Sequence, residues 1–353
     1  MSKPLFLFVL VACLSACQQK APVEEPATII DMPVSTEQGG ALSGGPATAP
    51  MTPRPDLLEG TRWPVAEVTS GQAHVSCDLD PATNGDGEPL VDLSYEGVMA
   101  ALQSCKQAGI VRLRYEGKIS TDFTALVERV ANIANRLHID QRILDLDSSG
   151  GHVEDAMKAG DAIGASKWTL WVRDDAICHS ACVLILAAGD DRQVAGKVGI
   201  HRMMRVDSTA TTRAELNQEL REVYAQMKEY LERNGASVAV ADLMMTVPNR
   251  KLRLLTEEEL QEYGLEGTNA VQDDLERIQL TRKCGEDFVK RKDDFTRAFD
   301  RECMQPDKGA EAIDACGLEL RQGFGFPDEK CPLESPLSRH DGIDREAGQV
   351  GAK

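Results

Sequence analysis

The sequence predicts an α/β protein with a small helical region at its C-terminal end. Between residues 110 and 233, short apolar segments alternate with longer segments whose apolar residues recur at helical spacing. After residue 270 only the helical pattern continues, and four cysteines lie in this part of the chain. Strands that alternate with helices favour a largely parallel sheet, and the clustered cysteines favour a helical appendage held by disulfides.

The first strand and helix of this pattern are the clearest. Residues 110–115 (Ile-Val-Arg-Leu-Arg-Tyr) alternate apolar and polar side chains, which is typical of a strand. Residues 121–137 place Phe123, Val127 and Val130 along one helical stripe. A helix over 121–137 is therefore expected to cover the sheet that the strand begins.

The following segments repeat this order. Residues 143–147 form a second alternating strand, which the turn Ser148-Ser149-Gly150-Gly151 ends. A long amphipathic helix over 212–233 closes the series and carries Leu216, Leu220, Val223, Met227 and Leu231 on one stripe. The other expected elements are helices at 152–163 and 181–188 and strands at 168–172 and 198–200.

Charge and hydropathy exclude two classes of protein. The chain has 57 acidic and 39 basic residues and a net charge of −18, whereas a nucleic-acid binder needs a basic surface to displace counterions. Outside the N-terminus, the longest unbroken apolar run is residues 181–188. That run is far shorter than the roughly 20 residues of a membrane-spanning helix.

The N-terminus indicates export. Lys3 precedes an apolar segment, residues 4–12, which is too short to cross a bilayer and has the length of a secretory signal. The following Leu14-Ser15-Ala16-Cys17 resembles the lipobox of bacterial lipoproteins. The resemblance implies cleavage before Cys17, lipid on its thiol and a position on the periplasmic side of a membrane. Gln18, in place of Asp, favours the outer membrane, and the alternative is an ordinary signal peptide with an incidental cysteine.

Composition divides the rest of the chain. Residues 18 to about 60 are rich in Pro, Ala, Gly, Thr and Glu and show no helical or strand period, which indicates a disordered tether. The chain after about residue 335 is polar and is expected to be loose. The expected domains are a signal peptide (1–16), a lipidated cysteine and tether (17–60), an α/β domain (61–270), a helical Cys-rich appendage (271–335) and a flexible tail (336–353).

Eight cysteines remain when Cys13 and Cys17 are set aside, and an even number in an exported protein favours disulfides. Closeness in the sequence suggests Cys77–Cys105, Cys178–Cys182 and two bonds among Cys284, Cys303, Cys316 and Cys331. Alternatively, some thiols stay reduced in the core. The Cys178-His179 and Cys182 spacing does not complete a zinc site, so no metal is expected.

Three features between residues 148 and 201 carry candidate chemistry. Ser180 directly precedes a helix, where the N–H of Ala181 could meet a developing oxyanion. Gly150 or Gly151 could supply a second N–H donor, because glycine lets a substrate backbone approach closely. His201 follows a short strand and could serve as the base that a hydroxyl nucleophile requires. Taken singly, each has a plainer interpretation: a helix cap, a turn and a structural histidine.

In combination, these features resemble the Clp protease proteolytic subunit and its crotonase-like relatives. There a strand leads into S-P-G-G, a nucleophilic serine precedes a short helix ending in A-G, and the catalytic histidine ends a later strand. Here those positions hold residues 148–151, Ser180 with Ala188-Gly189, and Ile200-His201. Residues 254–265 resemble the family's helix that ends in Y-G-L. The resemblance covers about 110–268 and is closest to exported relatives with C-x-S-A-C around the serine, the periplasmic Clp-like proteins.

The resemblance implies a spiral of ββα units and a serine peptidase. Ser180 would be the nucleophile, His201 the base, and the N–H groups of Gly150, Gly151 and Ala181 the oxyanion donors. Nothing in the sequence resembles an ATP-binding loop, so the activity is expected to be ATP-independent and free of cofactors. The expected partners are a peptide or protein substrate, the membrane through lipid on Cys17, and a homo-oligomer.

The sequence departs from the family at three places. Ser149 replaces the proline of S-P-G-G, Cys178-His179 replaces a glycine before the nucleophile, and Leu252 stands where the family has its catalytic aspartate. Asn249 and Asp242 are the nearby candidates for a third group. These departures leave open a Clp-like binding module of weak or absent activity. An acyl-thioester enzyme is disfavoured, because those relatives use no serine nucleophile.

Overall fold

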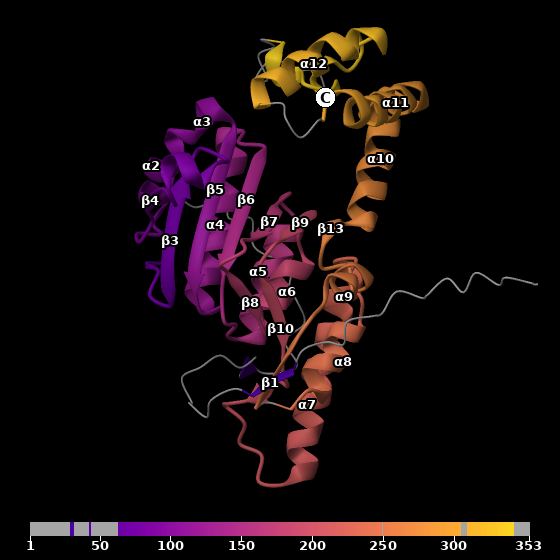
Figure 1. Ribbon diagram of the computed structural model, residues 1–353. Helices are drawn as coiled ribbons and strands as arrows, with labels where there is room; N and C mark the ends of the chain where they lie inside the picture. Colours follow the sequence, from indigo (N-terminus) through magenta and orange to yellow (C-terminus); the bar gives the residue numbers. More distant parts are fainter. Residues whose placement is uncertain (1–28, 32–41, 44–62, 249, 305–308, 342–353) are drawn as a thin grey trace, which may run out of the picture.

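The computed structural model describes residues 29–31, 42–43, 63–248, 250–304 and 309–341. Its main sheet has seven strands (Figure 1), in the order β13 (Gly267–Thr268), β9 (Asp191–Val194), β7 (Thr169–Val172), β6 (Gln141–Asp147), β5 (Ile110–Gly117), β3 (Gly71–Ser76) and β4 (Glu88–Pro89). The inner strands β5, β6, β7 and β9 run parallel, while β3, β4 and β13 pair antiparallel at the two edges. The expected α/β class with parallel strands is confirmed.

A second, four-stranded sheet lies beside the first. Its order is β1 (Ile29–Asp31), β12 (Lys251–Leu254), β10 (Lys197–Ile200) and β8 (Ile177–His179). The chain alternates between the two sheets, since β7 is followed by β8 and β9 by β10. A helix follows each pair: α6 (Cys182–Ala187) after β8 and α7 (Arg213–Arg233) after β10 and the short β11 (Met204–Arg205). This succession is the ββα repeat expected from the sequence.

Amphipathic helices bury their apolar stripes against the sheets. Four of them pack in a row: α2 (Tyr95–Gln103), α4 (Thr121–Leu137), α5 (Val153–Gly164) and α6. The bounds of α4 are those predicted, and its apolar positions are buried. Tyr230 joins α7 to α6, because its hydroxyl donates to the Leu184 carbonyl at 2.6 Å. On the predicted stripe of α7, Leu216 is the exception: it is 37% exposed, whereas the other four residues are buried.

Short helices complete this part of the chain. They are α1 (Pro81–Asn84), α3 (Cys105–Ala108), α8 (Ala239–Thr246) and α9 (Glu257–Glu262). A capping box at Thr256 and Glu259 begins α9. Within the described residues, no helix is both long and apolar enough to span a membrane.

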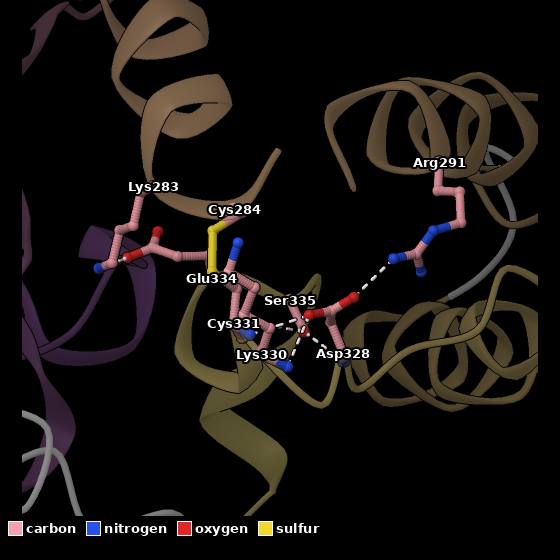
Figure 2. Close-up of a disulfide and its surroundings, with 8 residues drawn as sticks. All are labelled: Lys283, Cys284, Arg291, Asp328, Lys330, Cys331, Glu334 and Ser335. Carbon is pink, nitrogen blue, oxygen red and sulfur yellow. Dashed lines mark hydrogen bonds and ion pairs between the residues drawn. A yellow bond between two sulfur atoms is a disulfide. The ribbon is translucent and has the colours of Figure 1, made fainter. Parts of the chain in front are cut away.

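The C-terminal helices form a separate small core at the far end of α10 (Ala270–Cys284), as Figure 1 shows. This appendage contains α11 (Glu286–Glu302), α12 (Ala310–Gly323) and two short 3-10 helices, η2 (Pro332–Glu334) and η3 (Ser338–His340). Its core is largely aromatic, with Phe288 packed edge-on against Phe326 at 5.4 Å between ring centroids. The Cys284–Cys331 bond ties α10 to the segment before η2, beside the Lys283–Glu334 and Arg291–Asp328 ion pairs (Figure 2).

The appendage extends beyond its predicted end at residue 335. Arg321 donates to the carbonyls of Pro336 and Leu337 and forms an ion pair with Asp341. The part of the expected tail up to residue 341 is therefore packed, because a nearly buried guanidinium needs these acceptors. Residues 342–353 lie outside the described part of the chain.

Four disulfides join the eight cysteines. Two of them are the pairs suggested by closeness in the sequence, and the other two join the last four cysteines, whose pairing the sequence left open. Cys77–Cys105 and Cys178–Cys182 lie in the α/β domain. Cys284–Cys331 and Cys303–Cys316 lie in the appendage. The alternative of reduced core thiols does not hold for these residues.

Two segments of the predicted tether form short strands. Residues 29–31 are β1, which pairs antiparallel with β12, and β2 (Leu42–Ser43) pairs parallel with β11. The composition of this region predicts no strands, because its partners lie more than 150 positions further along the chain and leave no local period. The signal peptide, Cys17 and the rest of the tether lie outside the described residues.

Candidate active site

The glycine turn after β6 lies directly against Ser180. Gly150 has φ +100°, a conformation that favours glycine, and an added Cβ would lie 2.7 Å from the Ser180 Cβ. The Ser148 N–H donates to the Ile177 carbonyl at 2.7 Å, and the His179 N–H donates to the Ser148 carbonyl at 2.9 Å. These two bonds hold the turn beside β8, the strand that ends one residue before Ser180.

Ser180 is buried, and its backbone conformation is strained. Its φ is +60°, which is uncommon for a residue with a side chain, and it is 0% exposed. Among the described residues, its Oγ has no hydrogen-bond partner. The N-cap of α6 is Ala181 rather than Ser180, so the plainer interpretation of Ser180 as a helix cap does not apply. A buried hydroxyl without a partner at a strained turn is typical of a functional group.

Two backbone N–H groups near Ser180 have no acceptor within the described part of the chain, those of Gly151 and Ala181. The third predicted donor differs from them, because the Gly150 N–H already donates to the Ser148 Oγ at 3.2 Å. The close approach at Gly151 requires glycine, since an added Cβ would lie 2.0 Å from the Ile119 carbonyl oxygen. Of the three predicted donors, Gly151 and Ala181 are therefore the two that could meet an oxyanion.

His201 follows the last residue of β10 and is 1% exposed. Its Nδ1 lies 3.0 Å from the carbonyl oxygen of Arg202. Because a carbonyl only accepts, Nδ1 must carry the proton and donate. In the neutral ring this leaves Nε2 as the basic nitrogen. A backbone carbonyl thus fixes the tautomer that a general base requires.

The structure brings Ser180 and His201 to the same end of neighbouring strands. β8 and β10 pair in parallel, and the Ser180 N–H donates to the Gly199 carbonyl at 2.8 Å. In this state, however, the Ser180 Oγ makes no hydrogen bond to the imidazole. A change of the Ser180 rotamer or of the neighbouring backbone is needed to join the pair, and such hydrogen bonds often tighten only when substrate binds.

His179 is the last residue of β8 and pairs with Gly199 of β10. Its ring packs over Gly199, where an added Cβ would lie 3.0 Å from the His179 Cδ2. Its Nε2 is buried and has no partner among the described residues. Burial, together with the nearby His201, lowers the pKa of His179 to about 4. His179 is therefore a neutral, weakly basic group at neutral pH.

The low pKa of His179 predicts a pH-dependent loss of stability. Unfolding restores an ordinary pKa near 6.5, so the unfolded chain binds the extra proton first, and stability falls as pH drops from 6.5 to about 4. In the His179→Asn variant, the free energy of unfolding should fall by about 2–3 kcal/mol less over this pH range than in the unmodified protein. Urea unfolding at neutral pH and near pH 4 measures it, with the exposed His138→Asn as the control. Equal pH dependence in both variants would contradict the assignment.

Neither Leu252 nor Asp242 supplies the third catalytic residue that the family resemblance implies. Leu252 is an apolar residue of β12, 3% exposed, and its Cδ1 packs close to Gly199. Asp242 is exposed on α8, where it accepts a hydrogen bond from the Tyr224 hydroxyl. Asn249 lies outside the described residues. One partner that orients His201 is the Arg202 carbonyl, which sequence patterns do not reveal because every residue has a carbonyl.

The Cys178–Cys182 disulfide spans the turn that presents Ser180. Its Cα atoms are 5.2 Å apart, and both cysteines are fully buried. A loop this short constrains the unfolded chain by only about 2 kcal/mol. The bond therefore acts mainly on the local geometry of Ser180.

Replacing both cysteines by alanine is expected to lower kcat/KM by about 10–100-fold, because a small displacement of a nucleophile has a large effect on rate. The free energy of unfolding should fall by no more than about 2 kcal/mol. The matched control is Cys303→Ala with Cys316→Ala, which removes a disulfide of the appendage. An unchanged kcat/KM in the Cys178/Cys182 variant would show that the bond does not position Ser180.

One ionic contact near the site was not predicted. Arg205 of β11 reaches Glu154 in the first turn of α5 at 3.2 Å and Glu219 of α7 at 3.3 Å. The only available signal was the position of Arg205 four residues after His201, which is too weak to predict a contact with α5. Among the described residues, no group of three or more His, Cys, Asp or Glu is placed to bind a metal ion.

No protein-family model matches the chain, and no curated protein matches it significantly. Similar solved structures include an alanine variant of the 1510-N membrane-bound stomatin-specific protease, at 18% identity and a TM-score of 0.35, covering 46% of this chain and 81% of that one. A second variant of that protease, in complex with a substrate peptide, has 18% identity and a TM-score of 0.33, covering 43% and 71%. A variant of ClpP1 from Listeria monocytogenes has 16% identity and a TM-score of 0.36, covering 47% of this chain and 92% of that one. Each likeness covers less than half of the present chain.

Proposed function

We propose that this protein is a serine peptidase of the exported compartment, anchored by lipid on Cys17 and independent of ATP. Ser180 is the nucleophile, His201 is the general base, and the N–H groups of Gly151 and Ala181 hold the oxyanion. Gly150 contributes the close approach that lets Ser180 sit beside the turn. The observation that carries the proposal is the Ser180 Oγ, a buried hydroxyl at a strained turn that no described residue satisfies.

The chemistry follows from these positions. His201 Nε2 takes the hydroxyl proton as the Ser180 Oγ attacks a peptide carbonyl, and the carbonyl oxygen becomes an oxyanion that two N–H groups stabilise. His201 then gives the proton to the leaving amine, and water hydrolyses the acyl-enzyme by the reverse roles. The Arg202 carbonyl holds the tautomer throughout. The apolar Leu252 stands where the family has the aspartate that stabilises the imidazolium. A slow enzyme is expected.

The anchor rests on the lipobox-like residues 14–17. Cys17→Ser is expected to abolish incorporation of lipid, since the thiol is the acceptor. Metabolic labelling with palmitate, followed by separation of membrane and soluble fractions, measures it. The Cys13→Ser variant is the control and should stay labelled. Unchanged labelling of Cys17→Ser would contradict the lipoprotein assignment.

A second candidate function is a Clp-like binding module without activity. It is favoured by the missing hydrogen bond between Ser180 and His201 in this state, and by an apolar Leu252 in place of an acid. Such a protein would still bind extended peptides but would not cleave them.

Digestion of an unfolded protein separates the two candidates. Purified full-length protein should cleave casein slowly, equally with and without ATP, and Ser180→Ala should abolish the cleavage. Ser237→Ala removes a hydroxyl that accepts a bond from the Ala239 N–H and serves as the matched control. Cleavage that survives Ser180→Ala would come from a contaminant, and binding without cleavage would favour the module.

A further inference from the structure

A short strand from the N-terminal segment lies between the two elements that flank the candidate site. β2 (Leu42–Ser43) pairs with β11, which begins three residues after His201. β2 also contacts α5, which begins two residues after Gly151. Residues nearly 140 positions before Ser180 in the chain are thereby placed beside the two elements that follow its proposed base and its oxyanion turn.

The gap that β2 fills is bounded on both sides by the site's own elements. α5 continues the turn that carries Gly151, and β11 continues the chain that carries His201. Arg205 of β11 also spans the gap through its ion pair with Glu154 of α5. Both elements that border β2 therefore adjoin residues of the proposed site, Gly151 before α5 and His201 before β11.

The strand edge available in the gap is that of β11. Extended peptides bind proteins by adding a strand to a free edge, through backbone hydrogen bonds that do not depend on sequence. Within the described part of the chain, β11 has β2 as its single strand partner. Ser180 and His201 are 0% and 1% exposed in the same state.

We propose that residues 42–43 occupy the edge of β11 in the absence of substrate, and that an extended polypeptide substrate takes the same edge during turnover. This inference rests on the proposed peptidase function. β1, which ends eleven residues before β2 begins, pairs with β12. This pairing keeps β2 close to β11, so the effective concentration of β2 at that strand edge is high. A two-residue strand makes few hydrogen bonds, and an incoming substrate strand can therefore displace it.

The test weakens β2 in the full-length protein. Leu42→Pro with Ser43→Pro removes both N–H donors of the strand. Val34→Pro with Ser35→Pro makes the same kind of change in the same segment, outside the described strands, and is the matched control. Hydrogen exchange at Met204 and Arg205 should become at least about tenfold faster in the first variant and stay unchanged in the control. Unchanged exchange in the first variant would show that β2 does not cover β11.

Two further measurements test whether β2 keeps a probe away from Ser180 and a peptide away from the edge of β11. The rate at which a fluorophosphonate probe labels Ser180 should rise about fivefold in the Leu42/Ser43 variant, as expected for the loss of one or two net hydrogen bonds. On a Ser180→Ala background, a fluorescent peptide with the sequence of residues 38–47 should bind about fivefold more tightly when β2 is weakened, measured by anisotropy.

The outcomes separate this inference from the proposed function. Faster exchange with unchanged labelling and unchanged peptide affinity would overturn the inference and leave the peptidase standing. No labelling in any variant, with tighter peptide binding in the weakened one, would overturn the peptidase but support β2 as the occupant of a peptide edge.

Discussion

Replacing Ser180 by alanine is expected to lower kcat/KM for a peptide substrate by about 10⁴-fold or more, and replacing His201 by alanine should cost a similar factor. In the proposed mechanism the two residues act as one unit, because the hydroxyl is a weak nucleophile unless a base takes its proton. The double variant should therefore be hardly slower than either single one. Residual rate would come from the oxyanion donors and from substrate binding.

The controls for this prediction have the same residue types, and His179 also lies on β8. His179→Asn should retain most of the activity, since its pKa of about 4 makes it a poor base at neutral pH. Ser237→Ala should have no effect on kcat/KM. If His179→Asn abolished activity while His201→Ala did not, the roles of the two histidines would have to be exchanged. Additive losses in the Ser180/His201 double variant would argue against a shared mechanism.

The largest effect on stability is expected at Asp145, in the centre of the main sheet. Its side chain is fully buried on β6 and forms ion pairs with three arginines, Arg114 at 2.8 Å, Arg173 at 3.1 Å and Arg112 at 3.7 Å. Arg112 is itself 0% exposed. Asp86 also pairs with Arg112 and Arg173, and Asp147 with Arg114, but both lie partly exposed. Removing the buried carboxylate that all three arginines share leaves buried guanidinium charge only partly compensated, which is far more costly than losing a surface pair.

Asp145→Ala is accordingly expected to lower the free energy of unfolding by about 3–5 kcal/mol. Asp293→Ala removes an exposed pair with Arg277 on the appendage and should cost less than about 1 kcal/mol. Urea unfolding followed by circular dichroism, with all disulfides intact, measures both. If Asp145→Ala were no more costly than Asp293→Ala, the carboxylate would not be needed to neutralise the buried arginines.

The elements with a strong local period could be predicted from the sequence. The α4 helix has its predicted bounds, because its apolar stripe is long and starts and ends at clear signals. The strand β8 was missed, since its three residues show no period and its existence depends on pairing with β10. The strands β1 and β2 were missed for the same reason, because their partners lie far along the chain.

The candidate site shows a similar division. The glycine turn, Ser180 and His201 could be selected as residue types in a known order. The structure places the turn against Ser180, and Ser180 and His201 at the same end of neighbouring strands. What the sequence could not show is conformation: the φ of +60° at Ser180, which separates a strained turn from a helix cap. Nor could it show that the Gly150 N–H is engaged by Ser148, or that the Arg202 carbonyl contacts Nδ1 of His201.

The central claim is that the Ser180 hydroxyl is an activated nucleophile, and covalent labelling tests it most directly. Purified full-length protein should react with a fluorophosphonate probe, and mass spectrometry of the digested adduct should place the probe on the peptide that contains Ser180. His201→Ala should suppress the adduct and Ser237→Ala should not. Absence of any adduct on that peptide, under conditions where a known serine hydrolase is fully labelled, would contradict the account.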